Sequence, residues 1–187
     1  ELLADATEKA SVMANWLGTL PYQQKTINNS WIRLLWHQFH DDIPGTSINE
    51  AYKYSVNDQV LNQLDLSRTL NNAVGGVAAN LNTSWCENIP LVVYNPLSQD
   101  RTDIVEATIN IEENIEHLKI TDSDGRQVPV QIVDNNNGEI KFIFLATVPS
   151  LGYSTYNVSP TQSDESYENE LHISENGMEN GRYRISI

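Results

Sequence analysis

The N-terminal part of the chain carries apolar residues at helical spacing. Apolar side chains recur every three or four residues at Leu3, Ala6, Ala10, Met13, Leu17 and Leu20, which indicates one face of an amphipathic helix. Pro21 predicts the end of this helix. A second helix is predicted from about Ile27 to His40, with an apolar stripe at Ile27, Trp31, Leu35 and Phe39. Because apolar residues occupy more than half of its surface, we expect this helix to be buried from several sides.

A third helix has a clear start signal. Pro44-Gly45 is a turn dipeptide, and Ser47 precedes Glu50 by three residues, the spacing of a capping box. Apolar positions then follow at Val56, Val60, Leu64, Leu70, Ala73, Val77 and Leu81. The pair Gly75-Gly76 predicts a bend or an end. Short loops between consecutive helices favour a three-helix bundle.

Near Trp85–Pro90 the spacing of apolar residues changes from the helical period to every second residue. Val105, Ala107, Ile109 and Ile111 alternate with polar residues, as do Ile140, Phe142 and Phe144, which is typical of half-buried strands. Asp124-Gly125 and Asn137-Gly138 predict tight turns. We therefore predict an α+β fold of two domains: a helical bundle at residues 1–86, then an antiparallel, β-sandwich-like region at residues 87–187. The Ser-rich, acidic stretch Ser159–Glu170 is predicted to be a loop or linker.

Charge and cysteine content narrow the classes of function. The net charge of −14 is concentrated in residues 85–187, which argues against binding to nucleic acid or to an anionic membrane surface. The single cysteine, Cys86, excludes an intrachain disulfide and a Cys-based zinc site. No apolar run approaches the ~20 residues of a membrane span. The chain begins at Glu1 and ends at Ile187 inside a strand-like run, so we expect a piece of a longer protein, and no compartment is predicted.

One segment, residues 34–47, gathers polar groups between the second and third helices. His37 and His40 are three residues apart and can share a helix face. Imidazole nitrogen and carboxylate oxygen both ligate zinc, so His40 and Asp41 are candidate ligands. A histidine at a helix end is also a common partner of the helix dipole, and Asp41 and Asp42 fit an exposed turn equally well. They are weak candidates for a general acid/base pair, because adjacent carboxylates at a helix end point in different directions, whereas the two carboxylates of a retaining glycosidase sit about 5–5.5 Å apart across the substrate.

The segment from Gln38 to Ser47, Gln-Phe-His-Asp-Asp-Ile-Pro-Gly-Thr-Ser, resembles the Q-[FH]-H-D-x-[IL]-x-G-[ST] motif of the α-mannosidases of glycoside hydrolase family 38. In that family the motif lies in the helical domain that follows the catalytic α/β domain. Val92–Ser98 resembles the strand that opens the family's β region, and Glu170–Ile185 resembles the start of its large C-terminal β domain. Asp42 and Pro44 are closer to the bacterial members.

The resemblance implies a role for two residues. His40 matches the histidine that ligates the catalytic zinc, and Asp41 matches the aspartate that hydrogen-bonds sugar hydroxyls. Family members are retaining enzymes that hydrolyse terminal α-mannosides of glycans, and zinc positions the sugar. The nucleophile and the other zinc ligands are expected in an N-terminal α/β domain, so no catalytic residue is assigned in this chain.

The same resemblance implies partners for the chain. These are α-mannoside glycans, the missing α/β domain and the rest of the C-terminal β domain. We expect the surface around His40 to face the α/β domain and so to expose unusually many apolar groups. The isolated chain should lack activity and hold zinc weakly or not at all, because a catalytic site needs about three protein ligands.

Two alternatives remain open. The chain could be a non-catalytic helical-bundle and β module for binding or interaction, in which case His40 is structural. It could also belong to a different zinc hydrolase, in which His40 and Asp41 both ligate the metal.

Overall fold

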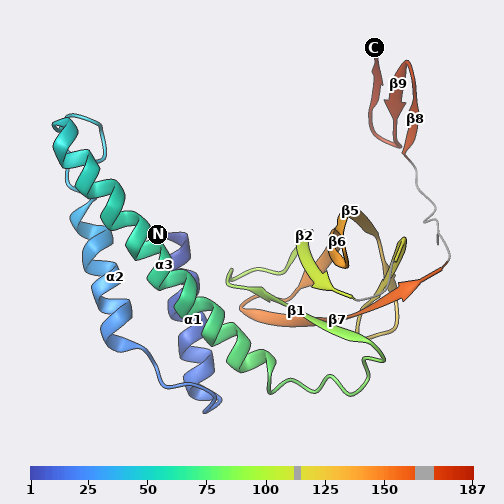
Figure 1. Ribbon diagram of the computed structural model, residues 1–187, viewed down its shortest axis with the longest axis horizontal. Helices are drawn as coiled ribbons and strands as arrows, with labels where there is room; N and C mark the ends of the chain where they lie inside the picture. Colours follow the sequence, from blue (N-terminus) through green and yellow to red (C-terminus); the bar gives the residue numbers. More distant parts are fainter. Residues whose placement is uncertain (112–114, 163–170) are drawn as a thin grey trace. The chain divides into compact units, whose positions relative to one another are not determined.

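The computed structural model describes residues 1–111, 115–162 and 171–187. Helices α1 (Leu2–Trp16), α2 (Gln24–Trp36) and α3 (Asn49–Ala78) precede the strands, as Figure 1 shows. The described strand pairs for which a register is given are antiparallel. This order confirms the predicted α+β fold. Among the described helices, none combines the length and the apolarity that crossing a membrane requires.

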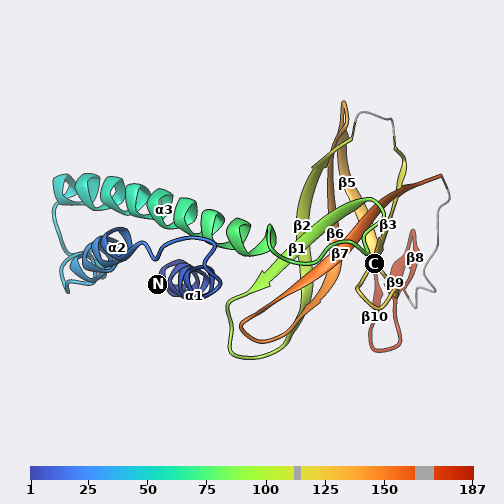
Figure 2. The ribbon, with the colours of Figure 1, turned by 90° about the horizontal axis from the view of Figure 1, so that it is seen from below.

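In the helical part, α2 lies along the first half of α3 and α1 lies along the second half (Figure 2). The core between α1 and α3 is built from small side chains: Ala10, Ala14, Ala73 and Val77 are all buried. Gly76 permits a close approach here, because a Cβ on it would lie 3.1 Å from the Leu20 side chain. Helix α3 continues through Gly75-Gly76 to Ala78, so the end predicted at this pair is wrong.

The predicted ends of the first two helices differ from the structure. Helix α1 ends at Trp16, before Pro21, because Gly18 adopts a φ of 68° and the amide of Thr19 donates to the carbonyl of Ala14, a glycine-dependent helix end. Helix α2 ends at Trp36 rather than His40.

The predicted capping box at Ser47 is also wrong. Ile48 is the N-cap of α3 and makes no side-chain capping bond. The amide of Ser47 instead donates to the Tyr52 hydroxyl at 3.0 Å, which holds the chain before the helix starts.

The strands form three described sheets. Their bounds are β1 (Ile89–Asn95), β2 (Arg101–Asn110), β3 (His117–Thr121), β4 (Gln127–Val128), β5 (Val130–Asn136), β6 (Glu139–Val148), β7 (Gly152–Thr161), β8 (His172–Ser174), β9 (Gly177–Glu179) and β10 (Arg184–Ser186). The sheet orders are β1-β7-β3-β4, β2-β6-β5 and β10-β9-β8. The predicted turn at Asn137-Gly138 joins β5 to β6, and both residues have the positive φ that this tight hairpin requires, 50° and 89°.

The chain forms two compact units. One contains Glu1–Cys86, Pro90–Thr102 and Thr147–Thr155, and the other contains Glu87–Ile89, Asp103–Ala146 and Tyr156–Ile187. The predicted division into residues 1–86 and 87–187 stays a prediction. Ser159 to Thr161 were predicted to be loop, but they finish β7, where they pair with β3. Residues 163–170 of that predicted loop lie outside the described residues.

The second unit has a core of alternating side chains. On β6, Ile140, Phe142 and Phe144 are buried at every second position, as the sequence pattern predicts. Phe144 meets Tyr156 of β7 edge-on, with ring centroids 5.1 Å apart.

Phe142 is fully buried, so Phe142→Ala should destabilise this unit by about 3–5 kcal/mol through lost burial and an unfilled cavity. The free energy of unfolding is measured by chemical denaturation, with circular dichroism as the signal. The matched control is Ile104→Ala, which removes an exposed side chain of β2. Equal losses for the two variants would contradict the assignment of Phe142 to the core.

Candidate functional site

The segment between α2 and α3, residues 37–48, is here called the α2–α3 turn. The carbonyl of Phe39 accepts from the amides of Asp42 and Ile43 at 2.9 and 3.2 Å. Gly45 has a φ of 82°, a left-handed conformation that glycine adopts without strain. The Tyr52 hydroxyl of α3 donates to the carbonyl of Asp41 at 3.0 Å. The turn is thus tied together by its own backbone and to the first turns of α3.

His40 and Asp41 lie side by side in this turn and face solvent. Their side chains are 77% and 52% exposed, and His40 Nε2 lies 3.4 Å from Asp41 Oδ2. The ring of Phe39 packs against the imidazole, with centroids 4.2 Å apart. The Thr46 hydroxyl donates to Asp41 Oδ1 at 3.3 Å. Both groups are therefore accessible to a ligand or to another part of the protein.

His37 has the opposite environment. Its side chain is 10% exposed, and its two ring nitrogens contact two carboxylates: Nδ1 lies 2.6 Å from Asp42 Oδ2, and Nε2 lies 3.0 Å from Asp58 Oδ2 of α3. The Ser55 hydroxyl donates to the same Asp42 oxygen at 2.9 Å, and Arg33 of α2 pairs with Asp58 at 3.5 Å. Both ring nitrogens of His37 are already engaged, so it is not available to a metal.

Two opposing effects act on the pKa of His37. Burial of the ring lowers the pKa. The hydrogen bonds to Asp42 and Asp58, together with their charges, raise the pKa by more than burial lowers it, so the pKa lies above the usual value for histidine. The pKa of Asp42 is lowered, chiefly by the hydrogen bond from His37 and also by that from Ser55, against a raising effect of burial. The arrangement favours an imidazolium, in which both ring nitrogens donate.

This raised pKa predicts a pH dependence of stability. Because the folded pKa of His37 exceeds the unfolded value of about 6.5, its contribution is complete below about pH 6.5 and is lost as the pH rises through the folded pKa. Thermal unfolding across this range should show that dependence in the wild type and a smaller one in His37→Asn. The control is His172→Asn, because His172 is an exposed residue of β8. A His37→Asn profile parallel to the wild-type profile would contradict this prediction.

The donor chemistry at the turn fits one ligand of a zinc ion. A neutral imidazole nitrogen is a favoured zinc ligand, and the His40 ring is exposed beside a carboxylate. Within residues 1–111, 115–162 and 171–187, no group of three or more His, Cys, Asp or Glu side chains could hold a metal. His40 by itself could contribute only one of the three or more protein ligands that a zinc site needs.

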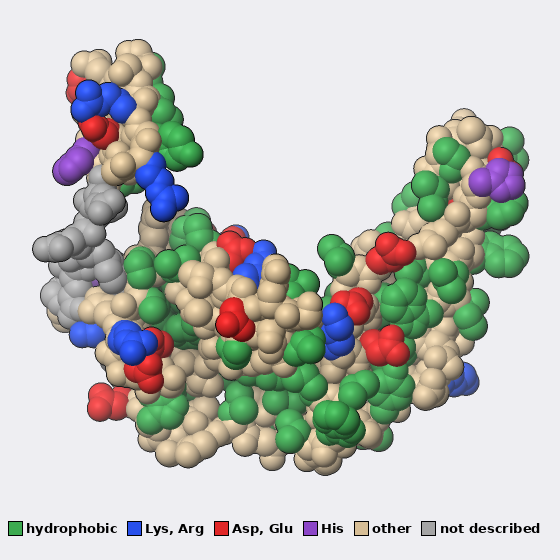
Figure 3. Space-filling model, turned by 180° about the vertical axis from the view of Figure 1, so that it is seen from behind, with side chains coloured by type: hydrophobic (Ala, Val, Ile, Leu, Met, Phe, Trp, Pro, Cys, Tyr) green, Lys and Arg blue, Asp and Glu red, His purple; other side chains and the backbone are tan. Residues whose placement is uncertain are grey.

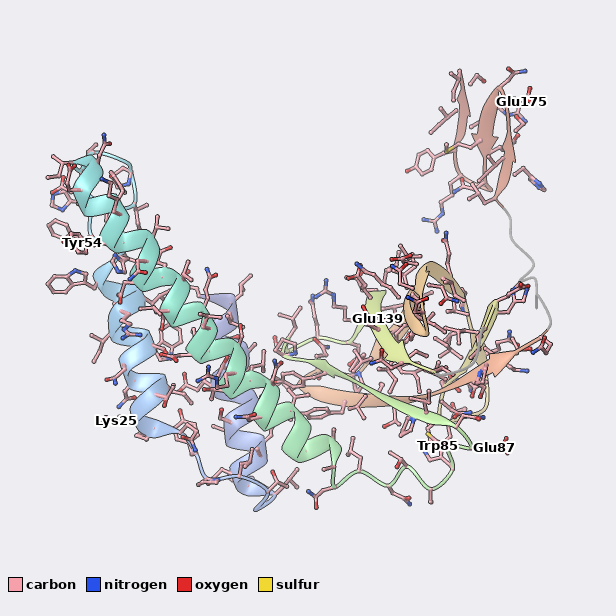
Figure 4. All side chains as sticks on the ribbon, in the orientation of Figure 1. Lys25, Tyr54, Trp85, Glu87, Glu139 and Glu175 are labelled. Carbon is pink, nitrogen blue, oxygen red and sulfur yellow. The ribbon has the colours of Figure 1, made fainter. Side chains whose placement is uncertain are left out.

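Exposed hydrophobic side chains are concentrated around the same segment. Trp36 is 76% exposed and Phe39 is 57% exposed. Figure 3 shows histidine among hydrophobic side chains at the end of the helical part where the α2–α3 turn lies. Tyr54 projects outward there (Figure 4). Residues 32–64, here called the apolar segment, also expose Ile32, Leu35, Ile43, Ile48, Val56, Val60, Leu61 and Leu64. The expectation that α2 is buried from several sides is wrong for this chain, whereas the apolar surface expected around His40 is present.

The network behind the turn was not found from the sequence. Sequence patterns alone predict no role for His37 and do not distinguish Tyr52, Ser55 or Asp58 from other polar residues of the third helix. One signal was available: these three polar residues are spaced by three along α3, so they share a helix face. His37 and Asp42 also flank the His40–Asp41 pair.

Comparison with known proteins gives consistent matches. No protein-family model matches the chain. The chain is 38% identical over 77 residues to the lysosomal alpha-mannosidase of Dictyostelium discoideum, a match that covers 41% of this chain and 7% of that protein. It is 35% identical over 71 residues to the epididymis-specific alpha-mannosidase of Homo sapiens, covering 37% of this chain and 7% of that protein. The matches thus span a small part of these curated relatives.

Two solved structures share the fold. An alpha-mannosidase from Enterococcus faecalis V583 matches with a TM-score of 0.74 and 17% identity, over 96% of this chain and 25% of that one. A glycosyl hydrolase family 38 protein from Enterococcus faecalis matches with a TM-score of 0.76 and 17% identity, over 100% of this chain and 28% of that one. The fold of the described residues is therefore found within larger enzymes.

Proposed function

We propose that this chain is part of an α-mannosidase of glycoside hydrolase family 38, a proposal supported by its similarity to alpha-mannosidases and to a family 38 structure, and that the full-length protein is a retaining, zinc-dependent α-mannosidase that hydrolyses terminal α-mannosides of glycans. The observation that carries the proposal is the His40–Asp41 pair. These two side chains are exposed and 3.4 Å apart, whereas the neighbouring His37 and Asp42 are engaged with each other.

Each residue of the pair has a separate role in the proposal. His40 holds zinc through a ring nitrogen, which requires the neutral imidazole. Asp41 accepts hydrogen bonds from sugar hydroxyls, and a carboxylate makes such bonds stronger than a neutral acceptor does. When bound, zinc supplies Lewis acidity and a template for orienting the sugar. The nucleophile and the general acid come from another part of the full-length enzyme.

The apolar segment supports this proposal over a free-standing binding module. Side chains such as Trp36 and Tyr54 are largely exposed in this chain, and large exposed apolar patches usually mark interaction sites. We propose that the rest of the enzyme covers this segment and brings its zinc ligands to His40. The remaining C-terminal β domain would be the other partner within the same protein.

The test uses the full-length protein and an activated aryl α-mannoside. We expect hydrolysis that a zinc chelator abolishes and added zinc restores. Asp41→Asn should retain zinc but lose roughly 10- to 100-fold in kcat/KM, because a charged hydrogen-bond acceptor is lost. The absence of α-mannoside hydrolysis, or hydrolysis indifferent to chelation, would refute the proposed function.

A further inference from the structure

We propose that His37 is a positioning residue for the zinc ligand: it locks the α2–α3 turn onto α3 and thereby fixes where His40 and Asp41 project. The inference rests on the proposed function and extends it to a residue that touches neither zinc nor substrate. It assigns the role to a histidine that the sequence motif leaves without one.

The first argument is the position of the contacts. His37 lies three residues before His40, and Asp42 directly follows Asp41, so the 2.6 Å bond between His37 and Asp42 closes a loop around the pair. The second ring nitrogen of His37 reaches Asp58 at 3.0 Å. One imidazole thus joins both ends of the loop to α3.

The second argument is that α3 also holds the backbone of this loop. The Tyr52 hydroxyl donates to the carbonyls of Asp41 and Asp42 at 3.0 and 3.3 Å, and Ser55 donates to the Asp42 carboxylate at 2.9 Å. These bonds engage the groups that face α3. The side chains of His40 and Asp41 remain exposed, so the network fixes the loop while leaving the pair free to bind.

The third argument is burial. The His37 side chain is 10% exposed, whereas that of His40 is 77% exposed. Because two carboxylates hold its two ring nitrogens, this largely enclosed imidazole has less freedom to rotate than an exposed side chain on an unanchored turn. A ligand held in place before the metal binds loses less conformational freedom on binding, and residues that orient ligands typically change metal affinity or activity by about 10- to 100-fold when mutated.

The test measures zinc affinity by chelator competition in the full-length enzyme. His37→Asn, whose short side chain spans only one of the two carboxylates, should bind zinc at least about tenfold more weakly. Asp42→Asn keeps the size of the side chain and should shift affinity in the same direction, which keeps the test decisive if His37→Asn does not fold. His37→Gln, which carries the same amide donor on a longer side chain, should recover part of the affinity.

The matched control is Asn62→Ala. Asn62 donates to the carbonyl of Ser30 at 3.1 Å between α3 and α2, so its loss weakens the same helix pair without touching the turn. It should lower the melting temperature and leave zinc affinity unchanged. Unchanged zinc affinity in folded His37→Asn and Asp42→Asn would overturn the inference, and so would an equal loss in Asn62→Ala.

A parallel His40→Ala variant separates this inference from the proposed function. If His40→Ala keeps its zinc, His40 is not a zinc ligand, so that part of the proposed function is wrong and the positioning role fails with it. If His40→Ala loses its zinc while His37→Asn binds zinc as tightly as the wild type, the positioning role alone is wrong.

Discussion

His40→Ala in the full-length enzyme should reduce kcat/KM for an aryl α-mannoside by more than about 100-fold, because even residues that only orient a metal ligand typically cost 10- to 100-fold. His40 is exposed beside Asp41 and would supply a ligand directly. Its truncation removes the nitrogen without disturbing a core, since the side chain is 77% exposed.

The control for this variant is His172→Ala. His172 lies exposed on β8, so its loss should leave both activity and melting temperature unchanged. A wild-type value of kcat/KM in His40→Ala would contradict the ligand assignment and leave His40 as a polar residue in an exposed turn.

The isolated 187-residue chain should show no α-mannosidase activity and no zinc site tighter than about micromolar, because a catalytic zinc site needs about three protein ligands. The described residues hold no cluster of three ligating side chains, and His37 is already bound to two carboxylates. The measurements are calorimetry with zinc and a hydrolysis assay on the purified chain.

The hydrolysis assay on the isolated chain needs its own His40→Ala control, which reveals any trace of contaminating enzyme. Turnover by the wild-type chain above that control would show that the catalytic groups are present in this part of the protein. Tight zinc binding that depends on both His40 and Asp41 would favour the alternative of a different zinc hydrolase.

Local patterns predicted the elements of the fold well where a local interaction decides them. The alternation around Phe142 predicted a buried strand face, and Asn137-Gly138 predicted the hairpin, because a tight turn depends on its own two residues. The predicted end of α1 at Pro21 was wrong because Gly18 ends the helix first. Of the bend or end predicted at Gly75-Gly76, the end was wrong, because α3 runs on to Ala78; the missing side chain of Gly76 leaves room for Leu20.

Long-range contacts explain what the sequence did not predict at the candidate site. The motif singled out His40 and Asp41, and both lie exposed in the turn. The role of His37 depends on Asp58, which follows it by 21 residues and approaches only when α3 packs against α2. The exposure of Trp36 could not be read from helical periodicity either, because an apolar helix face looks the same whether its partner is in this chain or elsewhere.

The zinc content of the purified full-length His40→Ala protein, compared with the wild type and His172→Ala, tests the central claim most directly. Elemental analysis after dialysis against a weak chelator measures it without reference to catalysis. We expect zinc in the wild type and in His172→Ala, and none retained in His40→Ala. A full complement of zinc in His40→Ala would contradict the assignment of His40 as a ligand.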